Sequence, residues 1–168
     1  MANITPNSLA SEIHTDLGSP CEIGVNSISF WLRSRIGDLN NYLYTDFVNI
    51  STDSSAFYQN VDGTTVYMTE AEKAVFKQLY FIKYYETQIR NNLGAAAIDP
   101  IQEISSDGAR VKKINRNELS KSYLELKKQA VQELTDMVNS YKINNSRARQ
   151  VAGDDVFDNP YNIRTDTE

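Results

Sequence analysis

The sequence predicts a mainly α fold: a helical bundle with two long amphipathic helices, a small β-hairpin at about 101–114 and an extended C-terminal tail. Apolar residues recur every three or four positions over 69–93 and again over 118–142, which is the period of a helix with one buried face. An Asp-Gly pair flanked by alternating residues lies between these two stretches. From residue 143 onward polar residues dominate, and 168 residues suit one domain with length to spare.

The N-terminal part predicts two shorter helices. Leu9, Ile13 and Leu17 recur every fourth residue and predict a helix over 8–17, which Gly18 caps and Pro20 ends. A second helix is predicted over 27–44, with Asn26 or Ser27 as its N-cap. Its buried stripe is formed by Ile28, Trp31 or Leu32, Ile36, Leu39 and Leu43. Trp31 is interpreted as a core anchor because of its size.

The segment 45–68 is predicted to be irregular, with at most one short extended piece and a turn at 61–64. Thr69 and Glu72 then form a capping box that opens a helix over 69–93, and Gly94 is predicted to be its C-terminal cap. Aromatic side chains occupy more than one face of this helix. It is therefore either central in the domain or in contact with a neighbouring subunit, and the candidates for a subunit interface are Phe76, Tyr80 and Tyr84.

The hairpin at 101–114 is predicted around Asp107-Gly108, a pair that favours a type I′ turn. A two-residue loop places Ile104 opposite Val111, Glu103 opposite Lys112 and Ile101 opposite Ile114. Apolar residues then face apolar residues and acid faces base, a match that a slip of one residue would lose. Because an isolated hairpin is only marginally stable, we expect it to pack on the helices or to join a sheet with other copies.

The last helix is predicted over 118–142, with Asn115 or Asn117 as its cap. The predicted apolar stripe contains Leu119, Tyr123, Leu126, Ala130, Leu134, Met137 and Tyr141. The favoured interpretation is an antiparallel pair with the helix at 69–93, and the alternative is a coiled-coil seam with another chain.

A change of composition at residue 143 divides the chain into a helical domain, 1–145, and a polar tail, 146–168. Sparse apolar residues in the tail predict docking on another chain through Val151, Phe157, Tyr161 and Ile163. The alternatives are a tail that is disordered when free and a tail that folds back on its own domain.

Few residues of this chain suit catalysis. Cys21 is the only cysteine and His14 the only histidine, so we expect no disulfide within the chain, no metal site and no cofactor. The sequence contains neither of the glycine-rich motifs that bind nucleotide phosphates, GxxxxGK[ST] and GxGxxG. Asp154, Asp155 and Asp158 are interpreted as a solvated acidic segment rather than a cation site. We therefore predict that the chain is not an enzyme. No signal peptide or membrane span is predicted, which indicates a soluble intracellular protein or one assembled inside a cell.

The net charge of −5 argues against a dedicated DNA-binding module but not against a protein that surrounds DNA without gripping it. Lys113 and Arg116 are the candidates for contacts with DNA phosphates. The alternatives for these two cations are an acidic neighbour and a solvated strand edge.

In the order of these elements the chain resembles the head–tail adaptor, or connector, proteins of tailed bacteriophages, especially those of marine phages. The resemblance covers about 5–155. It rests on the paired N-terminal helices, the capping box at 69–72, the Ser-Asp-Gly turn, the Leu93-Gly94-Ala95-Ala96-Ala97 junction and the segment 150–155. The long insertion at 45–68 departs from the family plan.

This resemblance implies a structural protein of the virion neck, assembled in the host cytoplasm and seated below the portal. Such subunits form a ring, usually of twelve copies, that joins the portal to the tail. Their tails reach the portal or the next neck protein, and packaged DNA passes through the channel. The competing prediction is a monomeric helical interaction module that binds another protein.

Overall fold

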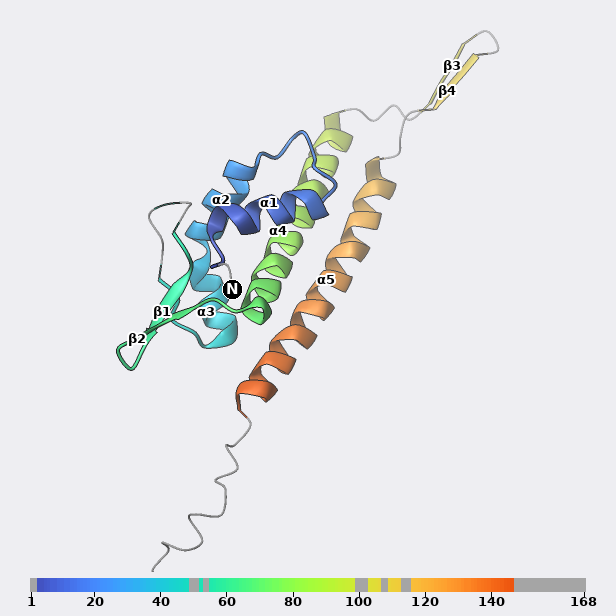
Figure 1. The fold of residues 1–168 in the computed structure, drawn as a ribbon. Coiled ribbons are helices and arrows are strands. Elements are labelled where there is room, and N and C mark those ends of the chain that lie inside the picture. The colour runs from blue at the N-terminus through green and yellow to red at the C-terminus, as the bar shows by residue number, and fades with distance from the viewer. Residues whose placement is uncertain are drawn as a thin grey trace, which may run out of the picture.

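Two long antiparallel helices, α4 (Glu70–Ile98) and α5 (Arg116–Asn145), lie side by side in the computed structural model (Figure 1). Each is about 45 Å long at 1.5 Å per residue. Three shorter helices, α1 (Pro6–Asp16), α2 (Val25–Ser34) and α3 (Ile36–Leu43), pack beside α4. The structure describes residues 3–48, 52, 55–98, 103–106, 109–112 and 116–146. Within them the predicted mainly α fold is confirmed.

α1 begins two residues earlier than predicted because Thr5 supplies its N-cap. The Thr5 and Ser8 side chains each accept a hydrogen bond from the other residue's backbone N–H, which completes a capping box, and Pro6 takes the first helical position. The chain leaves the helix through Gly18, whose φ is +79°. The predicted end of this helix is therefore confirmed.

The single helix predicted over 27–44 is wrong, because the chain forms two helices that meet at Arg35. The Arg35 backbone (φ −113°, ψ 16°) departs from helical values; its N–H donates to Trp31 O and its carbonyl accepts from Asp38 N. α2 begins after Gly24 instead of at the predicted cap. The apolar spacing of four continues through the break, so the predicted stripe residues Ile28, Leu32, Ile36, Leu39 and Leu43 are all buried.

The segment 45–68 holds two strands, β1 (Tyr58–Val61) and β2 (Thr64–Tyr67), where at most one extended piece was predicted. They pair antiparallel, with Tyr58 opposite Tyr67 and Val61 opposite Thr64. Asp62 and Gly63 have φ values of +50° and +78°, which is a type I′ turn at the predicted place. Phe57 N–H donates to Ile4 O and anchors the hairpin to the N-terminus.

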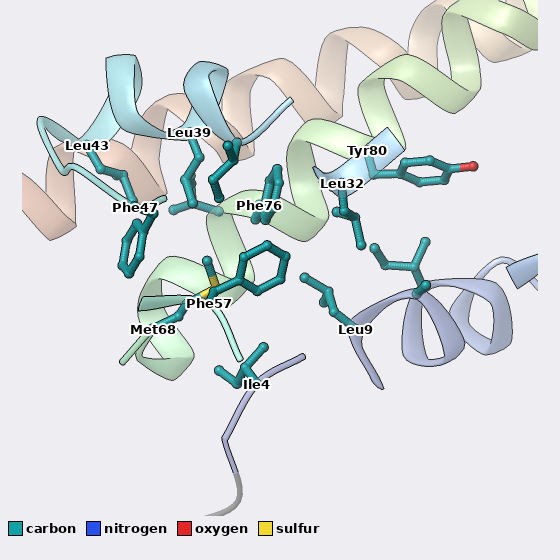
Figure 2. Close-up of a cluster of buried hydrophobic side chains, with 14 of the residues drawn as sticks. Ile4, Leu9, Leu32, Leu39, Leu43, Phe47, Phe57, Met68, Phe76 and Tyr80 are labelled. Carbon is teal, nitrogen blue, oxygen red and sulfur yellow. The ribbon is translucent and has the colours of Figure 1, made fainter. Parts of the chain in front are cut away.

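The core lies between α1, α2, α3 and the N-terminal half of α4 (Figure 2). Leu134 and Val138 of α5 and residues of the loops complete it. Phe57 and Phe76 are fully buried at its centre, with an edge-to-face ring contact of 5.7 Å between centroids. The Trp31 ring makes a similar contact of 5.2 Å with Tyr80 and packs against this core, as predicted. Phe57 belongs to the segment 45–68, which was predicted to be irregular, and its burial was not predicted.

α4 continues five residues beyond its predicted end at residue 93. Gly94 lies inside the helix, which ends at Ile98, so its predicted role as a C-terminal cap is wrong. A glycine inside a helix costs no more than about 1 kcal/mol of stability relative to alanine. The three alanines that follow Gly94 favour a helix, so the helix continues through it.

The second hairpin has the predicted register. β3 (Glu103–Ser106) pairs antiparallel with β4 (Ala109–Lys112), and Glu103 faces Lys112 while Ile104 faces Val111. The predicted pair of Ile101 and Ile114 and the turn residues Asp107 and Gly108 lie outside the described residues. The hairpin stands beyond the ends of α4 and α5, away from α1–α3 (Figure 1).

α5 begins at Arg116 and ends at Asn145, so it is longer at both ends than the predicted helix. Asn117 lies inside the helix and is not its cap, while Asn115 lies outside the described residues. The tail from residue 147 onward also lies outside them.

Two glycine substitutions are expected to change stability in opposite directions. Gly18→Ala should lower the free energy of unfolding by about 1 kcal/mol because alanine is strained at positive φ. Gly94→Ala should raise it by about 0.5–1 kcal/mol, since a Cβ there meets open space in a helix. Urea unfolding of the two variants measures both. A loss of stability in Gly94→Ala would contradict its position inside α4.

Candidate interaction surface

The register of α4 against α5 is fixed by buried polar contacts. Gln78, which is buried, donates from Nε2 to the carbonyl oxygen of Ala130 at 3.1 Å and to Oε2 of Glu133 at 2.8 Å. Farther along the pair, Lys127 Nζ lies 2.8 Å from Glu86 Oε1. These contacts hold the two helices antiparallel, which confirms the favoured prediction for this pair.

Glu72 links the beginning of α4 to the end of α5. The residue is 4% exposed, and its carboxylate accepts from the Thr69 N–H at 2.7 Å, from Thr69 Oγ1 at 2.9 Å and from the Tyr141 hydroxyl at 2.7 Å. Burial and this hydrogen bond raise the pKa of Tyr141 to about 12. The capping role of Glu72 was predicted, whereas its contact with Tyr141 was not.

A charged cluster ties α1 to α4. Glu12 accepts from Lys73 Nζ at 2.9 Å and from Lys77 Nζ at 3.0 Å, and Lys77 also pairs with Asp16. The hydrogen bond from Lys73 lowers the pKa of Glu12, and those to Glu70 and Glu12 raise the pKa of Lys73. Burial opposes the charge on Lys77, but its two carboxylate partners outweigh burial and raise its pKa. All these charges are paired, so the cluster is interpreted as structural.

The apolar face of α5 is wider than the part that α4 covers. At about 100° per residue, the apolar side chains of α5 other than the exposed Ile143 spread over roughly 160° of the helix circumference. The centre of this arc is buried and consists of Ala130, Leu134 and Val138. Five side chains at the edges are between 36 and 43% exposed: Leu119, Leu124, Leu126, Val131 and Met137. A helix that packs on one neighbour needs an apolar stripe of only about 100°.

These exposed side chains form two apolar margins, one on each side of the contact with α4. Leu119, Leu126 and Met137 form one margin, and Leu124 and Val131 form the other. The first three belong to the predicted buried stripe, so the prediction is wrong for their burial and right for Ala130 and Leu134. The second margin and Val138 were missed. The sequence feature that could have predicted these residues is the seven-residue spacing of 124, 131 and 138. A prediction based on one stripe with spacings of three and four does not include it.

Two of the three residues predicted for a subunit interface are buried in the core of the chain itself. Phe76 is fully buried and Tyr80 is 7% exposed, since both pack in the core against Trp31, so the prediction of a subunit contact through them is wrong. Tyr84 is half-buried and contacts the ring of Tyr85.

The remaining predicted contact residues lie at or beyond the ends of α5. Arg116 is exposed in its first turn. Five predicted residues lie outside the described part of the chain: Lys113, Val151, Phe157, Tyr161 and Ile163. Of the predicted DNA contacts and docking residues, only Arg116 therefore has a described position.

Two clefts flank the last turns of α5. One of about 710 Å³ lies between the end of α3, β1 and α5, and is lined by Leu43, Tyr44, Val61, Tyr141 and Lys142 among others. The other, of about 490 Å³, lies between α4 and α5 beside Ala74 and Met137. The Lys142 ammonium lies 4.2 Å from the centre of the exposed Tyr44 ring at the first cleft.

Within the described residues no group of three or more histidine, cysteine, aspartate or glutamate side chains is placed to hold a metal ion. No helix in that part of the chain has the length and apolar content needed to cross a membrane. Comparisons with protein-family models, with curated proteins and with solved structures give no match. The candidate site is therefore the partly uncovered face of α5.

Proposed function

We propose that this chain is a structural protein of a bacteriophage neck, a virion component that forms a ring between the portal and the tail. The observation that carries the proposal is the apolar face of α5, which extends beyond α4 on both sides. A ring repeats one contact between two different faces of neighbouring subunits. Two apolar margins on opposite sides of one helix provide two such faces.

The resemblance to head–tail adaptors supplies the rest of the proposal. The ring has twelve copies, binds the portal above and the next neck or tail-completion protein below, and assembles in the host cytoplasm. Packaged DNA passes through its channel without sequence reading, and a net charge of −5 favours passage over tight binding. The role is architectural, with no catalytic reaction, cofactor or membrane partner.

Measurement of mass in solution tests the proposal, first for the 19.0 kDa chain alone and then with portal rings of the phage that encodes it. We expect a portal complex that gains a fixed multiple of the chain mass. A chain that stays monomeric and does not bind portals would contradict the proposal and support the alternative, a monomeric helical module that binds another protein.

Removal of residues 146–168 is expected to weaken portal binding without loss of the fold. The buried contacts at the end of α5, such as that of Tyr141 with Glu72, precede the cut. The thermal transition measured by circular dichroism should therefore be retained, while mass added to portal rings should fall. Collapse of the thermal transition would show that the tail belongs to the core of the domain.

A further inference from the structure

A third cleft, of about 510 Å³, lies where α2 and α3 face α4. Three half-buried apolar side chains line it, those of Trp31 in the last turn of α2 and of Leu79 and Ile82 in α4. The exposed Tyr42 of α3 lies at the same cleft. We call this site the Trp31 cleft. Apolar and aromatic side chains beside a few charged groups are the lining typical of a site that binds a ligand.

The charged groups of the Trp31 cleft leave an excess of positive charge. Two of them form a pair and cancel: Arg35 and Asp38, 3.6 Å apart. Among the described residues, Glu86 is the other carboxylate of the lining, and it accepts a hydrogen bond from Lys127 at 2.8 Å. Lys83 and Arg90 lie one helical turn before and after it and line the cleft as well. The hydrogen bond from Lys127 and the charges of these two cations outweigh burial and lower the pKa of Glu86. One carboxylate among three cations leaves two positive charges unbalanced, although the whole chain carries a net charge of −5.

The tail of the chain contains an acidic segment with an apolar centre. In the segment 154–158, Val156 and Phe157 lie between aspartates, and no cation is present. The aspartates are Asp154, Asp155 and Asp158. The apolar side chains suit the lining of the Trp31 cleft, and the carboxylates suit its excess of positive charge.

The tail begins within reach of the Trp31 cleft. Asn145 and Ser146 line the cleft at the end of α5, together with residues from the end of α3. Residues between 35 and 42 line the Trp31 cleft, and the eight residues of α3 are about 12 Å long. The seven residues 147–153 span up to about 23 Å when extended. They are therefore long enough to carry the acidic segment along α3 from one cleft to the other.

The cleft at the end of α5 is closer to the tail but suits the acidic segment less well. Its charged lining residues are one carboxylate and one ammonium, Asp46 and Lys142, so it has no excess of positive charge. The Lys142 ammonium also lies over the Tyr44 ring. A segment with three aspartates is therefore better matched by the Trp31 cleft.

We propose that the Trp31 cleft binds the segment 154–158 of the tail of the same chain. Phe157 packs against Trp31, and the aspartates face the cations of the cleft. The apolar contact provides affinity, and the charges select this segment. The proposal does not rest on the neck function, because it concerns the chain before it meets a portal. A portal that bound the tail more strongly would release it from the cleft.

Quenching of Trp31 fluorescence by acrylamide in the full chain tests the proposal, because Trp31 is the only tryptophan. Acrylamide is uncharged, so it measures how far the ring is covered and not the local charge. Asp154→Lys with Asp155→Lys should make docking about tenfold weaker, since two attractive contacts become repulsive. Acrylamide should then quench Trp31 more strongly than in the wild type.

The matched control is Asp166→Lys with Glu168→Lys, which changes the tail outside the segment 154–158. Both tail variants take the net charge from −5 to −1, because each exchange changes the charge by two. The control should be quenched as the wild type is. Equal quenching of the two tail variants would overturn the proposal, since the position of the aspartates would then not matter.

Reversal of charge in the cleft provides a second test. Lys83→Glu with Arg90→Glu should also raise quenching. Combination with Asp154→Lys and Asp155→Lys should restore the wild-type value, at a net charge of −5 because the two changes of four cancel. A folded combined variant that stays strongly quenched would overturn the proposal. Thermal transitions show which variants fold, and if the cleft variants do not, the two tail variants decide, because they leave residues 1–146 unchanged.

Dilution distinguishes the chain's own tail from the tail of a second copy. A segment tethered to its site has an effective concentration of about millimolar, so wild-type quenching should not change between about 100 and 1 µM. Quenching that increases on dilution would assign the docked tail to a neighbouring copy and overturn the proposal. Portals are absent from these measurements, so their outcome is separate from that of the neck function.

Discussion

Replacement of Phe76 by alanine is expected to lower the free energy of unfolding by about 3–5 kcal/mol, the largest effect of any single substitution we predict. Its side chain is fully buried and contacts the rings of both Trp31 and Phe57. Alanine would remove the apolar area of the ring and leave a cavity that these rigid aromatic neighbours cannot fill. Urea unfolding followed by tryptophan fluorescence measures the loss, because Trp31 is the only tryptophan.

The matched control is Phe30→Ala. Phe30 is 66% exposed. Within the described residues its ring makes one aromatic or cation–ring contact, with the guanidinium of Arg33. We expect a change within about 0.5 kcal/mol. Equal losses in the two variants would mean that Phe76 is not at the centre of the core, and would restore it as a candidate for a subunit contact.

The second large effect is expected for Tyr141→Phe, which should destabilise the chain by about 1.5–3 kcal/mol at neutral pH. The ring is retained, but the buried Glu72 carboxylate loses one of its hydrogen-bond donors, and burial makes this loss costly. Because the contact joins the beginning of α4 to the end of α5, the last turns of α5 should also exchange amide hydrogens faster. Urea unfolding and hydrogen exchange measure these effects.

The same contact predicts a difference at alkaline pH. The pKa of Tyr141 is about 12 in the folded chain, against about 10 for an ordinary tyrosine. The folded state therefore holds this proton more tightly, so its stabilising contribution is complete below pH 10 and is lost as the pH rises through 12. Tyr141→Phe should lack this part of the alkaline decline, although other tyrosines with raised pKa values, such as Tyr80, retain theirs.

Tyr44→Phe is the control for both measurements, since the Tyr44 ring is 83% exposed. It should match the wild type at neutral pH and in the alkaline range. If Tyr141→Phe and the wild type lose stability in parallel between pH 10 and 12, the hydroxyl of Tyr141 does not donate to Glu72 in solution.

The helical part of the fold could be predicted because one repeated pattern specifies it. In α4 the capping residues Thr69 and Glu72 mark the start, and the apolar period of 3.6 continues from there. The break at Arg35 could not be predicted in this way, because Leu32 and Ile36 keep the spacing of one continuous helix. The chain turns there through its backbone hydrogen bonds, and the nearest glycine, Gly37, lies inside α3 and not at the break.

Local sequence predicted turns more reliably than the elements around them. Asp62-Gly63 identified the first turn, yet the strands beside it were missed because Gln59, Asn60, Thr64 and Thr65 are polar on both faces. Those strands are held by contacts distant in sequence, such as that of Phe57 with Ile4. The buried role of Phe57 likewise depends on tertiary packing and has no periodic signal around it.

The candidate surface was predicted only in part. Aromatic residues on α4 were correctly recognised as too many for one face, but Trp31 of α2 packs against both Phe76 and Tyr80 inside the same chain. The sequence alone does not distinguish a second helix of the same chain from a neighbouring subunit. On α5 the sequence predicted one apolar stripe and missed Leu124 among others. The extent to which α4 covers the apolar residues of α5 is known only from the structure, in which Leu126 and Leu124 are exposed.

The hydrogen bond between Phe57 and Ile4 has a consequence for changes near the start of the chain. The Ile4 carbonyl accepts from the Phe57 N–H, and the Ile4 side chain is buried. A substitution or fusion that pulled this segment away would therefore release the backbone before β1 and expose part of the core at the same time.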